Sequence, residues 1–503
     1  MRLALVLLFL PLACAWLSSK DKEIVSSPDG HPVRLRCVNW YGAHQELFVS
    51  GGLELRSCGF IADRIQSIGA NCVRIPLSVQ LVRDNPAPLE SSVAGVNDPG
   101  CNVSTAMGVL DCQIRELTSR GLMVILNSHN SQAGWVGVYE MVPQGLWHLP
   151  GYPTSDWLAS LTALASRYRS NPLVVGIDIR NEIHDQDGTV ITWGQSDDIE
   201  TDWKVATLAA DAAIREVNPD LLVIVSGLCM GYDIRALQDL QNYRSKFVFT
   251  VHIYPWSYWF TYIDWNSIMI VASILTGVSA LGIFTLGGMG IFTLWGMVYH
   301  KLHMPDPLSW GYIIFPSIIV PALALGFSII WVQKTRSFGC NSLAEDVIPV
   351  LWGSVTWLAL AICSGCVLIS YENIFRWKTA GFWACVWCLL VSTSLVGLSA
   401  WFQTYAAAEW DMAKLSSDHI PVWVGEFGAN ITETKAHWQW VTRFLADKHW
   451  AYWAVNGRRW FNQWEREYLG LLTEDYGAVR DEAWTRTLFP NCCSWTNNTS
   501  SGG

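Results

Sequence analysis

The chain has 503 residues, of which 51% are hydrophobic, and it carries a formal net charge of -10. This length suffices for one barrel-sized domain of about 250 residues and a further segment. An acidic chain without a basic patch or a phosphate-cradling glycine loop gives no reason to expect nucleic-acid binding.

Residues 1–15 predict a secretory signal peptide. One arginine precedes a short apolar run, and small residues suited to cleavage follow at positions 13–15. Four glycosylation sequons agree with this route, at Asn102, Asn430, Asn497 and Asn498. We therefore expect a glycoprotein of the secretory pathway whose folded domain is lumenal or extracellular.

From about residue 33 the chain alternates apolar strands with amphipathic helices, which is typical of a parallel sheet with crossover helices. Helices are expected, for example, at 58–68, 157–168, 201–217 and 435–448. Eight strands are expected, at 33–39, 72–76, 123–127, 174–179, 221–226, 247–251, 422–424 and 451–454. This number favours a (β/α)8 TIM barrel over an open sheet, which would have fewer strands and a glycine turn for phosphate.

The connection between the sixth and seventh strands is a nearly uncharged insert, residues 262–405. Its four apolar stretches, 268–294, 310–332, 347–370 and 379–402, are near or above the roughly 20 residues that cross a bilayer. Tryptophans lie toward their ends, as interfacial aromatics do. An even number of spans returns both halves of the barrel to one side. We therefore expect an all-α membrane segment of about four transmembrane helices.

These features divide the chain into five parts: a signal peptide (1–15), a first barrel part (16–261), the membrane insert (262–405), a second barrel part (406–490) and a disordered polar tail (491–503). Eight cysteines lie outside the signal and the insert, and none has zinc-site spacing. An oxidising compartment permits disulfides among them. We favour a Cys101–Cys112 pair and interpret Cys37 and Cys72, within predicted strands, as buried thiols.

Polar and aromatic side chains follow six of the eight predicted strands. The stability of a barrel requires branched aliphatic residues inside, so a polar ring at the carboxyl ends of the strands indicates an active site. Glu182 follows the fourth strand and Glu426 the seventh; two carboxylates facing each other at the rim are what cleavage of a glycosidic bond needs. The other rim residues are Arg74, His129, Asn181, His252, Tyr254 and Trp453.

The motifs NCVRIP, LNSHN, RNE, VHIYPW, VGEFG and AYWAVNG resemble the strand-end motifs of glycoside hydrolase family 5, and PVRLRCVNWYG resembles its first strand. The Asn-Glu pair followed by Glu-Phe-Gly is the most specific part. The resemblance covers residues 30–260 and 406–485, and it excludes the insert. It implies a TIM barrel and a retaining β-glycosidase with catalytic glutamates on strands four and seven.

By this resemblance Glu182 is the general acid and then the base, and Glu426 is the nucleophile. The resemblance also implies roles for the remaining rim residues. Arg74 and Tyr254 would keep the nucleophile ionised, Asn181 would bind the sugar 2-hydroxyl, His129 and His252 would hold the ring and the acid, and Trp453 would be the stacking floor. No metal or organic cofactor is implied, because two carboxylates suffice.

The sequence predicts a membrane-anchored enzyme that cleaves a β-linked glucan, as oligo- or polysaccharide. Three alternatives stay open. The substrate could be a glycolipid, since a rim tethered near a bilayer suits a lipid-linked sugar. The barrel could be an inactive sugar-binding module. The insert could be a transporter, although its four apolar stretches lack the ionisable residues that usually mark a transport path.

Overall fold

The computed structural model describes residues 16–135, 144–243, 246–254, 415–428, 445, 448–456 and 469–490. The chain divides into two compact units. The first comprises Met1–Ser257 and Asp411–Gly503, and the second is Tyr258–Trp410, which lies outside the described residues.

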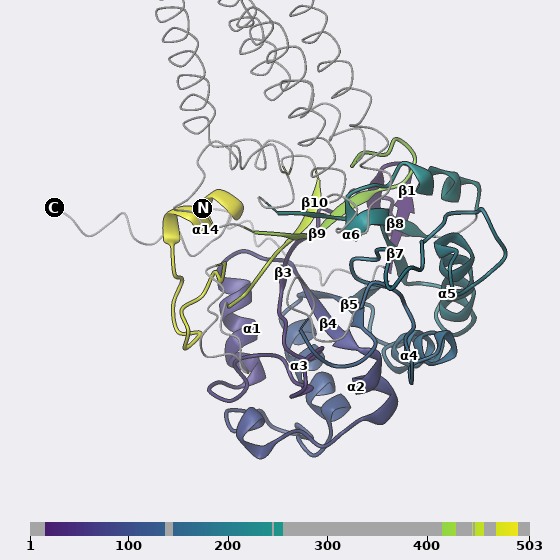
Figure 1. The fold of residues 1–503 in the computed structure, drawn as a ribbon. Helices are drawn as coiled ribbons and strands as arrows, with labels where there is room; N and C mark the ends of the chain where they lie inside the picture. The colour runs from purple at the N-terminus through teal and green to yellow at the C-terminus, as the bar shows by residue number, and fades with distance from the viewer. Residues whose placement is uncertain are drawn as a thin grey trace, which may run out of the picture. The chain divides into compact units, whose positions relative to one another are not determined.

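The first unit is built on a closed barrel of eight parallel strands (Figure 1). All eight predicted strands are present, and the predicted (β/α)8 barrel is confirmed for this unit. Their order around the barrel is β10-β3-β4-β5-β6-β7-β8-β9. The strands are β3 (Arg36–Asn39), β4 (Cys72–Ser78), β5 (Met123–Asn130), β6 (Val174–Asp178), β7 (Leu222–Ser226), β8 (Phe247–Ile253), β9 (Val422–Phe427) and β10 (His449–Tyr452).

Pairing between the last and the first strand closes the barrel. Ala451 of β10 lies opposite Cys37 of β3, which is in turn opposite Cys72 of β4. Every residue of β4, β8 and β9 is buried. Strands of a parallel barrel read as continuous apolar runs because helices cover their outer side and side chains fill the interior.

Helices lie outside the strands, where α1, α3, α2 and α4 can be followed in Figure 1. Side chains cap their first turns: Ser57 accepts a hydrogen bond from the backbone of Phe60, Thr105 accepts one from Gly108, and Asp202 caps α5. The bounds are α1 (Cys58–Ser67), α2 (Val79–Asp84), η1 (Glu90–Val93), α3 (Ala106–Ser119), α4 (Thr154–Arg167), α5 (Trp203–Val217), α6 (Leu228–Gly231), η2 (Ala236–Asn242) and α14 (Glu482–Leu488).

An antiparallel hairpin, β1 (Trp16–Lys20) and β2 (Glu23–Ser27), precedes the barrel and was not predicted. Leu17 and Ile24 of the hairpin pack in one core cluster with residues from the beginnings of the barrel strands, among them Leu222. The hairpin therefore covers the amino-terminal end of the barrel and leaves the carboxyl ends of the strands for a site.

Two disulfides join described residues. The predicted Cys101–Cys112 pair is present. The interpretation of Cys37 and Cys72 as thiols was wrong, because they form a disulfide between the neighbouring strands β3 and β4. Both residues point into the barrel core and lie directly opposite each other, so their sulfurs meet. Cys229 is disulfide-bonded as well.

Several predictions fall on residues outside the described ranges. These are the signal peptide, the insert 262–405 with its expected spans, the tail 491–503 and all of the helix 435–448 except residues 445 and 448. Within the described part of the chain, no helix combines the length and the apolar character that a bilayer crossing requires.

Candidate active site

The carboxyl ends of the barrel strands bring the predicted rim residues together. Arg74 lies in β4, His252 lies in β8 directly opposite Glu426 of β9, and Asn181 and Glu182 follow β6. These positions are distant in the sequence but adjacent in the barrel, because parallel strands all end at the same rim.

Glu426 is 4% exposed and both of its carboxylate oxygens have partners. Nη1 of Arg74 donates to Oε1, and the hydroxyl of Tyr254 donates to Oε2 at 2.8 Å. These two donors, one of them charged, hold the carboxylate in a single orientation. Glu426 is therefore suited to act as a nucleophile.

Arg74 is fully buried, and its guanidinium is shared among several acceptors. Nε and Nη2 both donate to Oδ2 of Asp178, at 2.9 and 2.8 Å, and Nη1 donates to Asn39. Burial opposes its charge, but the carboxylates of Asp178 and Glu426 outweigh that effect and raise the pKa of Arg74. Sequence reasoning missed Asp178 and Asn39; the available signal was a charged residue closing the apolar run VVGID.

Glu182 is placed differently from Glu426. Its side chain is 20% exposed, against 5% for that of Glu426. Its backbone has a φ of 29°, in the left-handed region that is strained for a residue with a side chain. Oε1 lies 2.8 Å from Nδ1 of His252. One carboxylate therefore faces the open rim while the other lies below it.

His252 connects the two glutamates. Its Nδ1 is 2.8 Å from Glu182 and 3.7 Å from Oε2 of Glu426. Burial opposes the charged imidazolium, but the carboxylates of Glu426 and Glu182 prevail and raise the pKa of His252. The ring is thus able to hold a proton between two acids.

His129 differs in its charge state, because burial, followed by the neighbouring ring of His44 and the charge of Arg74, lowers its pKa well below the usual value. Its Nδ1 lies 2.8 Å from Oδ1 of Asn127, and its ring centroid lies 4.4 Å from that of His44. His129 is therefore a neutral hydrogen-bonding group. His44 and Asn127 were not among the predicted residues.

Trp453 belongs to an aromatic group at the same rim. Its ring stacks on Tyr41 at 4.9 Å with an interplanar angle of 9°, and Trp135 meets it edge-on at 6.5 Å. The peptide bond between Trp453 and Ala454 is cis. The sequence had not singled out Tyr41 or Trp135. Flat stacked rings of this kind can contact the apolar face of a sugar.

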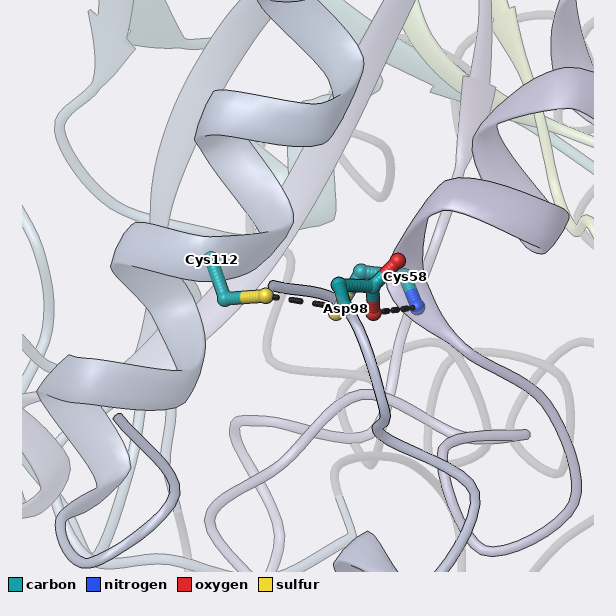
Figure 2. A group of neighbouring side chains, drawn as sticks. All are labelled: Cys58, Asp98 and Cys112. Atoms are coloured by element: carbon teal, nitrogen blue, oxygen red, sulfur yellow. Dashed lines mark hydrogen bonds between the residues drawn. The ribbon is translucent and has the colours of Figure 1, made fainter. Parts of the chain in front are cut away.

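Two groups of side chains bring possible metal ligands within 4.8 Å of one another in the described residues. One is Glu182, His252 and Glu426, the groups that acid–base chemistry would use. The other is Cys58, Asp98 and Cys112, between α1 and α3 (Figure 2). The sulfur of Cys112 is bonded to Cys101, so it cannot act as a thiolate ligand.

Asp98 in this second group has a structural role. Its two carboxylate oxygens accept hydrogen bonds of 2.8 Å from the backbone N–H groups of Cys58 and Gly59 at the start of α1. Burial, followed by the charge of Asp98, raises the pKa of the Cys58 thiol. These residues therefore fit a capped helix terminus better than a metal site.

Comparison with known proteins gives consistent results. Residues 55–275 match the family model described as Cellulase (glycosyl hydrolase family 5). The chain is 32% identical over 191 residues to an endoglucanase of Paenibacillus polymyxa, a match that covers 38% of this chain and 45% of that protein. It is 30% identical over 216 residues to the major extracellular endoglucanase of Xanthomonas campestris pv. campestris, covering 43% and 42%.

Among solved structures, the catalytic domain of the major endoglucanase from Xanthomonas campestris pv. campestris aligns with a TM-score of 0.54 at 19% identity, over 94% of this chain and 100% of that one. An endocellulase from Pyrococcus horikoshii aligns with a TM-score of 0.53 at 16% identity, over 95% and 98%. At these identities the alignments support the fold alone. The chain spans less than half the length of the two curated relatives described above.

Proposed function

We propose, taking as the premise that residues 55–275 match glycoside hydrolase family 5, that this chain hydrolyses β-linked glucan with retention of configuration. Glu426 is the nucleophile and Glu182 the general acid and base. The observation that carries the proposal is the pairing of two carboxylates, one buried between Arg74 and Tyr254 and the other partly exposed beside His252.

The separation of the two carboxylates favours retention over inversion. Oxygens of Glu182 and Glu426 lie within 4.8 Å of each other. Retaining enzymes place the two carboxyl groups about 5–5.5 Å apart, whereas inverting enzymes leave about 6.5–9.5 Å for a water molecule between sugar and base. The spacing is therefore suited to direct attack by one carboxylate.

In the first step Glu426 attacks the anomeric carbon as the bond to the leaving oxygen breaks. Glu182 gives its proton to that oxygen, so the leaving sugar departs as a neutral alcohol. The hydrogen bonds from Arg74 and Tyr254 keep the nucleophile ionised before attack and orient it. The products are a glycosyl ester on Glu426 and the ionised carboxylate of Glu182.

In the second step Glu182 removes a proton from water, and the oxygen of that water attacks the anomeric carbon. The ester bond breaks, the sugar leaves with its original configuration, and Glu426 returns as a carboxylate while Glu182 is again protonated. His252 supports this cycle, because its Nδ1 lies 2.8 Å from Glu182 and its raised pKa lets it donate a hydrogen bond to that carboxylate when the carboxylate is ionised.

The substrate class rests on the relatives and on the rim. The similar curated proteins include endoglucanases, and the aromatic group of Trp453, Tyr41 and Trp135 suits the flat faces of β-linked glucose units. The side-chain oxygen of Asn181 already accepts a hydrogen bond from Arg74, and its amide nitrogen would donate one to the sugar 2-hydroxyl. His129 would offer a neutral ring nitrogen to another sugar hydroxyl.

We also propose that residues 262–405 anchor the catalytic barrel to a bilayer, with the barrel on the lumenal or extracellular side. The four apolar stretches without ionisable residues support this. Extraction at alkaline pH tests it: a membrane-anchored chain stays with the vesicles, and a chain released like a peripheral protein would refute the anchor. A replacement of 262–405 by a short linker is the control.

The test of the enzymatic proposal is trapping. Cellobiosides carrying 2-fluoro and an activated leaving group should form a stable adduct on Glu426, identified by peptide mass spectrometry. Glu426→Gln should form none. Glu182→Gln should still be labelled, because an activated leaving group needs no proton, but should release the sugar slowly.

A panel that includes 2-fluoro glycolipid headgroups distinguishes the substrate. Labelling only by a lipid-linked sugar would replace the glucan by a glycolipid substrate. Binding of cello-oligosaccharides with neither turnover nor adduct would overturn the enzyme in favour of a sugar-binding module.

A further inference from the structure

We propose that Asp178 is a positioning residue for the nucleophile: it fixes the guanidinium of Arg74 in one orientation and takes up part of its positive charge, so that Glu426 stays reactive. This inference rests on the proposed role of Glu426. It assigns a function to a side chain at the end of β6 that touches no substrate and lies one layer below the reacting groups.

The geometry leaves Arg74 a single orientation. Its Nε and Nη2 converge on Oδ2 of Asp178, and Nη2 also donates to Oδ1 of Asn181 at 2.9 Å. Only Nη1 remains, and it donates to Asn39 at 3.0 Å and to Glu426. Rotation of the planar group would break the Asp178 contacts first, so Asp178 sets where Nη1 points.

Stability alone does not account for this carboxylate. The side chains of Asp178 and Arg74 are both 0% exposed. Among the described residues Oδ1 of Asp178 has no hydrogen-bond partner, so one oxygen of a buried acid is left without compensation. Buried ion pairs are weak contributors to stability because desolvation offsets attraction. Burial of Asp178 against Arg74, the partner of the nucleophile, costs free energy and is therefore better explained by function.

Two carboxylates share one guanidinium in this arrangement. Without the charge of Asp178, the whole field of Arg74 would act on Glu426, which would hold a proton less tightly and attack carbon less readily. A less basic carboxylate is also a better leaving group, so the glycosyl ester would break down faster. Asp178 thus shifts the balance of the two steps toward formation of the ester.

The charged groups around Asp178 and Glu426 come from four parts of the barrel. None of them changes the direction in which loss of the Asp178 charge shifts proton binding by Glu426. Removal of one negative charge near the nucleophile favours its ionised form whatever the state of the others. The titratable groups facing Asp178 or Glu426 are Arg74 on β4, Glu182 after β6, His252 and Tyr254 at the end of β8, and the two acids themselves.

The experiment compares Asp178→Asn with wild type and with Asp111→Asn. The control also removes one negative charge from an ion pair with an arginine, but on the surface, where its side chain is 42% exposed. Rates are expressed per active site, counted by 2-fluoro labelling, so that partly unfolded protein does not imitate an effect on the chemistry. Asp178→Glu restores the charge.

For Asp178→Asn we expect kcat/KM on aryl cellobioside to fall about tenfold or more, because a misplaced reacting group can lower the rate up to about a hundredfold. We also expect the acid limb of the pH profile of kcat/KM to move to lower pH and the 2-fluoro adduct to decay faster. Asp178→Glu should return the limb toward wild type, and Asp111→Asn should change nothing. If the acid limb of the pH profile does not move in Asp178→Asn, the proposal is overturned, whatever the rate of the variant. Absence of an adduct in wild type would instead overturn the proposed function.

Discussion

The hydroxyl of Tyr254 donates a 2.8 Å hydrogen bond to Oε2 of Glu426, the carboxylate oxygen that Arg74 does not contact. The two donors come from β4 and from the end of β8, on different sides of the nucleophile. Together they hold both oxygens, so the carboxylate cannot rotate without losing one bond. The contributions of the two donors can therefore be separated by substitution.

Tyr254→Phe should lower kcat with little change in KM. A hydrogen bond to a charged group contributes about 1.5–3 kcal/mol, which corresponds to a loss of roughly 10- to 100-fold in rate if the bond matters most at the transition state. Steady-state kinetics on cello-oligosaccharides measures it. Tyr168→Phe is the matched control, because it removes a 2.9 Å hydrogen bond to Asp111 away from the site. A kcat within twofold of wild type would contradict the role assigned to Tyr254.

Glu182→Ala should separate substrates by their leaving groups. Natural glucans need a proton on the departing oxygen, so their hydrolysis should fall by about a thousandfold or more, within the range that general acids supply. Dinitrophenyl cellobioside needs no proton on its leaving group in the first step, so the rate at which it forms the glycosyl ester should change little. Added azide should replace water in the second step and restore turnover. Equal losses on both substrates would argue against Glu182 as the acid.

The two mapped disulfides should contribute unequally to stability. Loop-closure entropy predicts about 4 kcal/mol for the Cys37–Cys72 pair, whose residues are 35 apart, and about 3 kcal/mol for Cys101–Cys112, whose residues are 11 apart. Paired alanine variants, unfolded in urea and followed by tryptophan fluorescence, test the order. Replacing the buried Cys37 and Cys72 should lower the free energy of unfolding more than replacing Cys101 and Cys112. A larger loss for Cys101–Cys112 would reverse the prediction.

The barrel and most of its rim were predictable because strand ends in a parallel barrel share one edge. Short apolar runs located the strands, and polar side chains were expected at their carboxyl ends. His252 and Glu426 lie opposite each other near the ends of β8 and β9, whereas Arg74 lies inside β4, which continues to Ser78. Glu182 was predicted on the same grounds, although its left-handed backbone has no sequence signature.

The features that the sequence did not predict depend on contacts between residues that are distant along the chain. Asp178 is the last residue of β6, and only the arrangement of the strands around the barrel brings it to Arg74. The Cys37–Cys72 disulfide needs the two cysteines directly opposite each other on neighbouring strands, which spacing along the chain does not reveal. The hairpin β1–β2 is short, and its packing of Leu17 and Ile24 under the barrel is a tertiary interaction.

His449, at the start of β10, should make the fold sensitive to acid. Its Nδ1 accepts a hydrogen bond of 3.1 Å from the backbone N–H of Leu35, which precedes β3, the strand that β10 pairs with to close the barrel. The ring must be neutral to accept. Burial, followed by the charges of Arg34 and Lys448, lowers the pKa of His449 to about 3.

The sign of the effect follows from proton binding. An unfolded histidine has a pKa of about 6.5, so below that pH the unfolded chain binds a proton that the folded chain refuses. The stability from this neutral ring is complete above about pH 6.5 and is lost toward about pH 3, at about 1.4 kcal/mol per pH unit. His44, with its pKa lowered to about 3 by burial and then by Arg74, adds a loss in the same direction.

His449→Gln should therefore give a shallower fall of the unfolding free energy with acid, because the amide oxygen can accept from Leu35 at any pH. Urea unfolding at a series of pH values between about 7 and 4 measures the slope, which should decrease by up to about 1.4 kcal/mol per pH unit. His419→Gln, on an exposed residue, is the control and should leave the slope as it is. If both variants kept the wild-type slope, the neutral ring at the closing seam would not be what acid disrupts.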